Sequence, residues 1–218
     1  MFHRKQGGAM RSKFVFLFVL AILLSSYKKA GIELSLLKVP LKIRKECFTA
    51  NTATLNEEEK NVVLYMNIAR CYPKYFLDSL FLPYAKEKGI DTKTMYYTTL
   101  VKTLRSMKPV AALTFYPDLY PFTLAHAQDM GKSGLMGHKS SKGVDFDKRL
   151  SKFNSFKGED CQYGYNDALD IVMDLILDEG IPSLGHRENI LMKGFARTAV
   201  SIQPHKTYGV NCVIDFTD

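Results

Sequence analysis

The end of the chain most constrains the fold, because its residue pattern differs from everything before it. Residues 195–203 and 208–216 are rich in β-branched and aromatic residues, with alternating small or branched positions. The loop of Pro204 to Thr207 between them is short enough for a hairpin. The segments before this hairpin carry apolar residues at helical spacing. The order therefore predicts an α+β arrangement in which helices pack in layers on a sheet.

Several helices are expected ahead of the hairpin. Asn56 is an N-cap residue followed by three glutamates, which complement the positive end of a helix dipole. Pro73 is expected to interrupt this helix, because proline lacks a donor N–H. Further helical patterns cover residues 92–107 and the runs that follow Pro117 and Asp167.

The N-terminus carries an unbroken apolar run of eleven residues at 14–24. This length is short for a membrane span and typical of a signal-peptide core. Arg11 and Lys13 precede the run, and Ser25 and Ser26 follow it. No alanine-x-alanine cleavage motif appears, so an uncleaved anchor stays open beside a cleaved signal peptide.

These features divide the chain into three parts. We expect residues 1–26 to be a signal peptide or signal anchor, with 1–9 an upstream extension if Met10 is the true start. Residues 27–54 form a basic and apolar connector, and residues 55–218 form the domain. The protein is then expected to be secreted, periplasmic or at the cell surface.

The net charge of +8 first suggests a nucleic-acid ligand. However, residues 1–45 alone carry a charge of +9, and residues 46–218 carry −1. Because the domain itself is nearly neutral, nucleic acid is excluded as a partner. The expected ligand is a small molecule, a lipid or a protein, and membrane contact would come only through an uncleaved N-terminal segment.

Three polar residues directly follow glycines, namely His138, Glu159 and His186. We interpret each glycine as a turn or a point of close backbone approach that presents the next side chain. Two imidazoles and a carboxylate could bind a divalent metal or transfer protons. Each histidine could also simply cap a loop. His126, inside a helical pattern, and His205, in the hairpin loop, are expected to be structural or surface residues.

Five segments follow one another between about residue 55 and residue 216: Asn67-Ile68-Ala69-Arg70 with Pro73 and Phe76, Leu124 to Met130 leading to His138, Gly158-Glu159-Asp160, Gly185-His186-Arg187-Glu188-Asn189-Ile190-Leu191, and residues 208–216. In these segments and their order the chain resembles the CAP superfamily in its bacterial form. This group includes sperm-coating-glycoprotein-like domains, cysteine-rich secretory proteins and plant pathogenesis-related proteins.

The resemblance implies a three-layer α-β-α sandwich with a C-terminal β-hairpin and a cleft lined by two histidines and two acids. His138, Glu159 and His186 match three of these positions, and the fourth falls on Asp178, beside Glu179. The cleft is expected to bind a divalent metal such as zinc, through His138 and His186, or a small or lipidic ligand.

Two alternatives to a binding domain remain. One is a metal-assisted hydrolase of the peptidase kind that uses the same cleft, with Glu159 as its catalytic residue. The other is an adhesion or host-interaction protein with a vestigial cleft. The sequence contains no H-E-x-x-H pair and no G-x-S-x-G elbow. We therefore expect a binding domain and not an enzyme.

Four cysteines in an exported chain suggest disulfides. We favour a bond between Cys161 and Cys212, since both are expected near the sheet. Cys47 and Cys71 would then form the remaining pair. Buried free thiols are the alternative.

Overall fold

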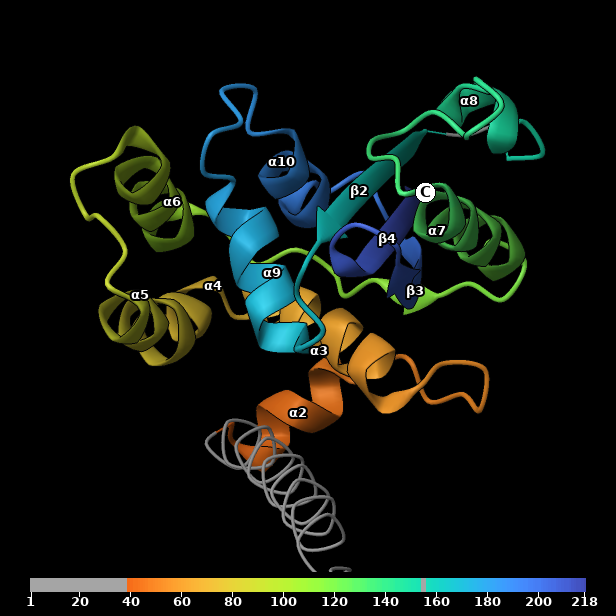
Figure 1. The fold of residues 1–218 in the computed structure, drawn as a ribbon. Helices are drawn as coiled ribbons and strands as arrows, with labels where there is room; N and C mark the ends of the chain where they lie inside the picture. Colours follow the sequence, from red (N-terminus) through yellow and green to blue (C-terminus); the bar gives the residue numbers. More distant parts are fainter. Residues whose placement is uncertain (1–38, 154–155) are drawn as a thin grey trace, which may run out of the picture. The chain divides into compact units, whose positions relative to one another are not determined.

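A computed structural model describes residues 39–153 and 156–218 (Figure 1). The predicted signal or anchor at 1–26 lies outside these residues. Lys42–Asp218 forms one compact unit, so it includes the end of the predicted connector; the domain boundary at residue 55 stays a prediction. Within the described part of the chain, no helix is both long and apolar enough to cross a bilayer.

The elements follow one another with helices first and the longest strands last. In chain order they are α2 (Leu41–Cys47), α3 (Glu57–Cys71), α4 (Pro73–Tyr75), the π-helix η1 (Phe76–Phe81), α5 (Leu82–Lys88), α6 (Met95–Ser106), β1 (Thr114–Phe115), α7 (Tyr120–Ser133), α8 (Phe146–Arg149), β2 (Lys157–Tyr163), α9 (Ala168–Leu177), α10 (Gly185–Leu191), β3 (Arg197–His205) and β4 (Gly209–Thr217).

The strands form one sheet in the order β1-β3-β4-β2. β3 and β4 pair as the predicted antiparallel hairpin, from Arg197 opposite Thr217 to His205 opposite Gly209. β2 pairs antiparallel with the other edge of β4, and β1 pairs parallel with β3. The sequence analysis missed β2, because its residues KGEDCQY lack the apolar alternation that indicates a strand.

Helices cover both faces of the sheet. α7 packs against β3 and β4 on one face, whereas α3 packs against β3 and α9, and both α9 and α10 contact β2 (Figure 1). The predicted α-β-α sandwich with a C-terminal hairpin is therefore confirmed. β2 and the central strand β4 lie between the two helical layers, and this position brings side chains of β2 close to α7 on one face and α10 on the other.

Polar side chains of α3 hold the sandwich together. Asn56 forms a capping box with Glu59, which confirms the predicted helix start, and the helix ends at Cys71 before Pro73. Asn67 donates to the carbonyls of Cys47 and Leu113. The fully buried Arg70 spreads its donors over four carbonyl groups, those of Ala111, Ile190, Met192 and Phe195. These bonds fasten α10 and the start of β3 to α3.

The three glycines that precede the candidate site residues act in different ways. Only Gly137 has a positive φ, at 100°, and so forms a turn that favours glycine. Gly158 lies inside β2, where a Cβ atom would stand 2.9 Å from Asn189 Oδ1 and 2.9 Å from Phe195 Cζ. Gly185 is the first residue of α10. Gly158 is therefore not in a turn, and it has the other role expected of these glycines, a close approach to a neighbouring segment.

Candidate functional site

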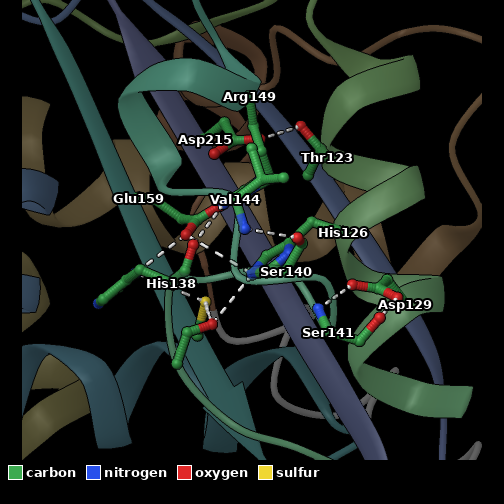
Figure 2. Close-up of polar contacts among 12 residues, drawn as sticks. Thr123, His126, Asp129, His138, Ser140, Ser141, Val144, Arg149, Glu159 and Asp215 are labelled. Carbon is green, nitrogen blue, oxygen red and sulfur yellow. Dashed lines mark hydrogen bonds and ion pairs between the residues drawn. The ribbon is translucent and has the colours of Figure 1, made fainter. Parts of the chain in front are cut away.

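The loop after α7 holds His138 over the sheet. Ser141 donates from its N–H and its hydroxyl to the Asp129 carboxylate on α7, at 2.7 and 2.5 Å. The Gly137 N–H donates to the Tyr163 hydroxyl at the end of β2, at 2.9 Å. Because the loop is fixed to both a helix and a strand, His138 lies directly beside β2 (Figure 2).

Glu159 of β2 is the centre of the site, with a side chain only 1% exposed. His138 Nδ1 lies 2.9 Å from its Oε1 atom. The other carboxylate oxygen accepts a hydrogen bond from Arg149, whose guanidinium also donates to the His138 carbonyl at 3.1 Å. The imidazole of His138 stays half exposed, so the buried carboxylate orients a ring that solvent can reach (Figure 2).

His126 and Cys161 complete a cluster of potential metal ligands. His126, on the buried face of α7, has Nε2 at 3.7 Å from Glu159 Oε1, and Cys161 Sγ lies 3.9 Å from His138 Nδ1. One ligand atom each from His126, Glu159 and Cys161 all lie within 4.8 Å of one another. We call these three residues with His138 the β2 cluster.

The environment sets the ionisation of the β2 cluster. Burial opposes the charge of Glu159, but the hydrogen bond from His138 and the charge of Arg149 outweigh it and lower the pKa of Glu159 below its usual 4.5. Burial lowers the pKa of His126 and keeps its ring neutral. Burial, with the charge of Glu159, raises the pKa of the Cys161 thiol well above 9.0.

The neutral His126 ring has one unpartnered nitrogen. Its Nε2 lies 3.0 Å from the Gly137 carbonyl, an acceptor, so Nε2 carries the proton in this network. The buried Nδ1 has no hydrogen-bond partner among the described residues. The Nδ1 lone pair is therefore free to accept a proton, and Nε2, the nitrogen near Glu159, can bind a metal only after the ring proton moves from Nε2 to Nδ1.

A second carboxyl group, Asp215 of β4, lies buried beside Glu159. It accepts a hydrogen bond from Thr123 of α7 at 2.7 Å (Figure 2). Complete burial and the charge of Glu159 raise the pKa of Asp215 well above its usual value. The pKa values of the two neighbouring carboxyl groups are thus shifted in opposite directions, that of Asp215 upward and that of Glu159 downward.

Asp178 and His186 form a separate pair between α9 and α10. His186 Nδ1 lies 2.8 Å from Asp178 Oδ1, and the backbone N–H groups of His186 and Arg187 donate to Oδ2 at 3.1 and 3.2 Å. Asp178 itself ends α9 in a left-handed conformation, with φ 60°. Its carboxylate therefore satisfies free amides in the first turn of α10 as well as orienting the imidazole.

The predicted cleft residues form two pairs, His138 with Glu159 and Asp178 with His186. The helices beside these two pairs contact opposite faces of β2. Glu159 contacts His126 on the α7 side, whereas the next residue, Asp160, accepts from Asn189 of α10 at 2.7 Å. Of the four predicted residues, the structure joins His138 with Glu159 and Asp178 with His186. A metal ion shared by His138 and His186 stays a prediction.

The sequence analysis missed four members of the site. His126 was interpreted as structural or surface, Cys161 was assigned to a disulfide, and Arg149 and Asp215 were not considered. His126 follows Thr123 by three residues, so the helical period predicts that both lie on the same face of α7, which is the buried one. Cys161 follows Glu159 by two residues, so the strand period predicts that both lie on the same face of β2. These periods do not predict which acidic residues the two faces contact, because that depends on how the strands pair in the sheet.

The predicted disulfide between Cys161 and Cys212 was wrong. All four cysteines are free thiols in the structure. In the register of β2 and β4, Cys161 is opposite Val213, and Cys212 is opposite Gln162. Since successive residues of a strand point to opposite faces, the two thiols are directed away from each other.

A search of curated proteins gave no match. The solved structures that resemble the chain include three bacterial proteins. An outer surface protein of Borrelia burgdorferi is 20% identical, covers 59% of this chain and 96% of its own, and has a TM-score of 0.42. An extracellular protein with an SCP domain from Bacillus anthracis is 18% identical, and the match covers 56% of this chain and 37% of the Bacillus chain, with a TM-score of 0.39.

The third structure is a cysteine-rich secretory protein from Staphylococcus aureus that is 16% identical. The match covers 56% of this chain and 36% of the Staphylococcus chain, with a TM-score of 0.35. This chain therefore spans little more than a third of the Bacillus and Staphylococcus chains.

A family model gives the decisive match. The cysteine-rich secretory protein family, CAP, matches residues 98–216. The signature expected around Asn67 to Phe76 lies outside this span and stays a prediction. The span includes every strand of the sheet except the last residue of β4, both predicted histidines and their acids, and it covers more than half of the 218 residues. With this match over the sandwich just described, the chain belongs to the CAP family.

Proposed function

We propose that this protein is an exported CAP-family binding domain whose β2 cluster holds a divalent metal ion, with zinc as the fitting ion. The observation that carries the proposal is that ligand atoms of His126, Glu159 and Cys161 lie within 4.8 Å of one another. His138 adds a second imidazole at 2.9 Å from Glu159 and 3.9 Å from Cys161. Two imidazoles, a carboxylate and a thiol make a donor set that suits zinc.

The ionisation of these donors supports the fit. A metal requires a neutral imidazole, and burial lowers the pKa of His126. It also requires a carboxylate, and the lowered pKa of Glu159 keeps that group ionised. The Cys161 thiol must lose a proton to bind. Arg149 is a competitor, because its guanidinium already neutralises Glu159.

Export is the second part of the proposal, and the N-terminal sequence supports it. The apolar run at 14–24, with Arg11 and Lys13 before it, has the length and flanks of a signal peptide or signal anchor. The near-neutral charge of residues 46–218 favours a small-molecule, lipid or protein ligand over nucleic acid.

Hydrolysis is the alternative function, and the half-exposed His138 favours it over an inert cleft. A carboxylate that orients an imidazole toward solvent is a common arrangement for a general base. Glu159 itself is 1% exposed and bound by two partners, so it is unsuited to act directly on a water molecule. In this function His138 would transfer the proton, and Glu159 would hold the His138 ring in position.

Zinc titration of the purified protein by calorimetry tests the proposal. We expect one zinc per chain in the wild type, and a loss of at least tenfold in affinity for the double variant of His126→Gln and Cys161→Ser. The matched control is His186→Gln, which alters an imidazole of the other pair and is expected to bind zinc normally. Equal binding by wild type and the double variant would refute the β2 cluster as the metal site, and weakened binding by the control would favour the ion shared between His138 and His186.

A peptide library assay with zinc present distinguishes binding from hydrolysis. Turnover by the wild type that is lost in His138→Gln, with zinc still bound, would establish the hydrolase. Zinc binding without turnover supports the binding domain.

A further inference from the structure

Two of the four cysteines lie side by side, far from the β2 cluster in sequence. The end of α2 contacts the end of α3 at three neighbouring points: Asn67 donates to the Cys47 carbonyl at 3.0 Å, the Tyr72 hydroxyl donates to the Glu46 carboxylate, and the side chains of Cys47 and Cys71 lie within hydrogen-bonding reach of each other. Since Asn67 and Cys71 are one helical turn apart, the backbone contact and the thiol contact follow one face of α3.

The two thiols differ in access. Cys47 is fully buried, whereas Cys71 is partly exposed and lines a cavity of about 480 Å³ between the end of α3 and the end of α6. Three exposed cations, Lys74, Arg105 and Lys108, line the same cavity, and none of its lining residues is acidic. A small anionic molecule can therefore reach Cys71 but not Cys47.

We propose that Cys47 and Cys71 are a redox-active pair that closes to a disulfide by exchange with a small anionic disulfide compound, which enters through the cavity beside Cys71. Cys71 is the attacking thiol and Cys47 is the resolving thiol. Nothing in this proposal depends on the metal site, because the residues are different.

The electrostatics of the pair support these roles. The hydrogen bond from Cys47 lowers the pKa of Cys71 to about 7, against the effect of burial, and the charge of Arg70 acts in the same direction. The same hydrogen bond and burial raise the pKa of Cys47. The thiolate is the nucleophile in exchange, so Cys71 is the thiol that reacts first.

The chemistry balances in two exchanges. The Cys71 thiolate attacks one sulfur of the disulfide compound, forming a mixed disulfide and releasing one small thiolate, which takes up the proton that Cys71 lost. Cys47 then loses its proton and attacks the Cys71 sulfur, forming the Cys47–Cys71 bond and releasing the second small thiolate, which takes up that proton. Two protein thiols are oxidised by two electrons in total, and one disulfide compound is reduced to two thiols.

The structural consequence is a covalent link between α2 and α3. α2 leads from the N-terminal part of the chain, whereas α3 belongs to the sandwich, and the bond would close a loop over the sequence between them. The disulfide would therefore hold the segment around Cys47 on the domain in an oxidising compartment.

Mass spectrometry of the full chain tests the pair. The reduced protein, kept in a chelator so that metal has no part, is treated with oxidised glutathione and quenched by alkylation at intervals. We expect peptides containing Cys47 and Cys71 to become linked with the loss of two hydrogen atoms. Cys212, which is buried, is the internal control in the same digest, and it is expected to remain free and to be alkylated only after unfolding. Cys161, which is partly exposed, is expected to be alkylated in the folded protein without becoming linked to another cysteine.

Two variants separate the roles of the thiols. We expect Cys47→Ser to accumulate glutathione at Cys71, because the resolving thiol is missing. We expect Cys71→Ser to take up glutathione at Cys47 at least tenfold more slowly, because Cys47 is buried. Rapid modification of Cys47 in that variant, or a stable mixed disulfide in the wild type, would overturn the proposal. Transient glutathione adducts in the wild type provide the same test should either variant fail to fold.

The charge of the cavity has its own test. Disulfide closure by anionic oxidised glutathione is expected to be at least several-fold faster than closure by cationic cystamine. The variant Arg105→Gln with Lys108→Gln is expected to remove this preference without changing the rate with neutral hydroxyethyl disulfide. Equal rates for the anionic and the cationic compound would refute the recognition of an anionic oxidant.

Discussion

His138 Nδ1 lies 2.9 Å from Glu159 Oε1, and this contact joins a half-exposed ring to a carboxylate that solvent scarcely reaches. Arg149 binds the second oxygen of the same carboxylate. Glu159 thus organises the site through two partners, one that faces solvent and one that is almost buried. The consequences of this arrangement can be measured in stability, pH dependence, metal binding and packing.

Removing the charge of Glu159 is expected to destabilise the fold. Glu159→Gln keeps the side-chain shape but leaves the guanidinium of Arg149, which is 11% exposed, without its carboxylate. Loss of one partner of a buried pair costs about 3 kcal/mol in the free energy of unfolding. Urea unfolding of wild type and variant measures the difference.

The matched control for this change is Asp147→Asn. Asp147 pairs with Lys157 at 3.7 Å, but its side chain is 85% exposed. An exposed pair contributes less than about 1 kcal/mol. If both variants lost the same stability, the claim that burial makes the Glu159 pair important would be wrong.

Asp160→Asn is expected to stabilise the protein at neutral pH. Asp160 is fully buried; Asn189 bonds one of its oxygens, and Oδ2 has no partner within the described residues. Burial, with the nearby charges of Asp178 and Glu159, raises the pKa of Asp160 well above 3.8. The folded state therefore holds a proton that the unfolded state loses as pH rises above 3.8.

The sign of this effect gives a distinctive pH profile. The stabilising effect of the variant should be absent below pH 3.8, where both states of the wild type are protonated, and should grow until the pH passes the folded pKa. Urea unfolding across this range measures it. A gain that did not change with pH would show that packing, and not ionisation, distinguishes the two side chains.

Zinc binding is expected to release a proton from Cys161. Burial raises the pKa of this thiol well above 9.0, so a metal at the β2 cluster must displace the thiol proton at neutral pH. The apparent zinc affinity should then rise about tenfold per pH unit for one released proton. Calorimetry in two buffers with different ionisation enthalpies counts the proton, and Cys161→Ser should lose the release. Binding without proton release would place the ion elsewhere.

Gly158→Ala is expected to destabilise the sandwich. A Cβ atom at this position would lie 2.9 Å from Asn189 Oδ1 and 2.9 Å from Phe195 Cζ, so β2 or α10 would have to shift. Overpacking of this kind costs about 1–3 kcal/mol. Thermal unfolding measures the loss.

Gly185→Ala is the control for this substitution. The nearest atom to its added Cβ is Ser183 Oγ at 3.6 Å, an ordinary contact, and alanine favours the helix in which Gly185 lies. We expect little change or a small gain in stability, and a loss as large as that of Gly158→Ala would contradict the packing argument.

Local interactions made much of the fold predictable. The start of α3 at Asn56, the interruption at Pro73 and the terminal hairpin all depend on residues close to one another in sequence. Capping, proline geometry and strand periodicity act over a few residues. The pairs of His138 with Glu159 and Asp178 with His186 were likewise within reach, because glycine-led motifs and family order mark their members.

Long-range pairing decided the remainder. The sequence by itself determined the fold class and the hairpin, which depend on local preference, and its motif order marked His138, Glu159, Asp178 and His186 as candidate site residues. Only the tertiary structure decided that His126, Arg149 and Asp215 surround Glu159 and that Cys161 faces away from Cys212. Each of these relations depends on the register of β2 against β4 or on the packing of helices, and a contact between distant residues has no signature in the residues themselves.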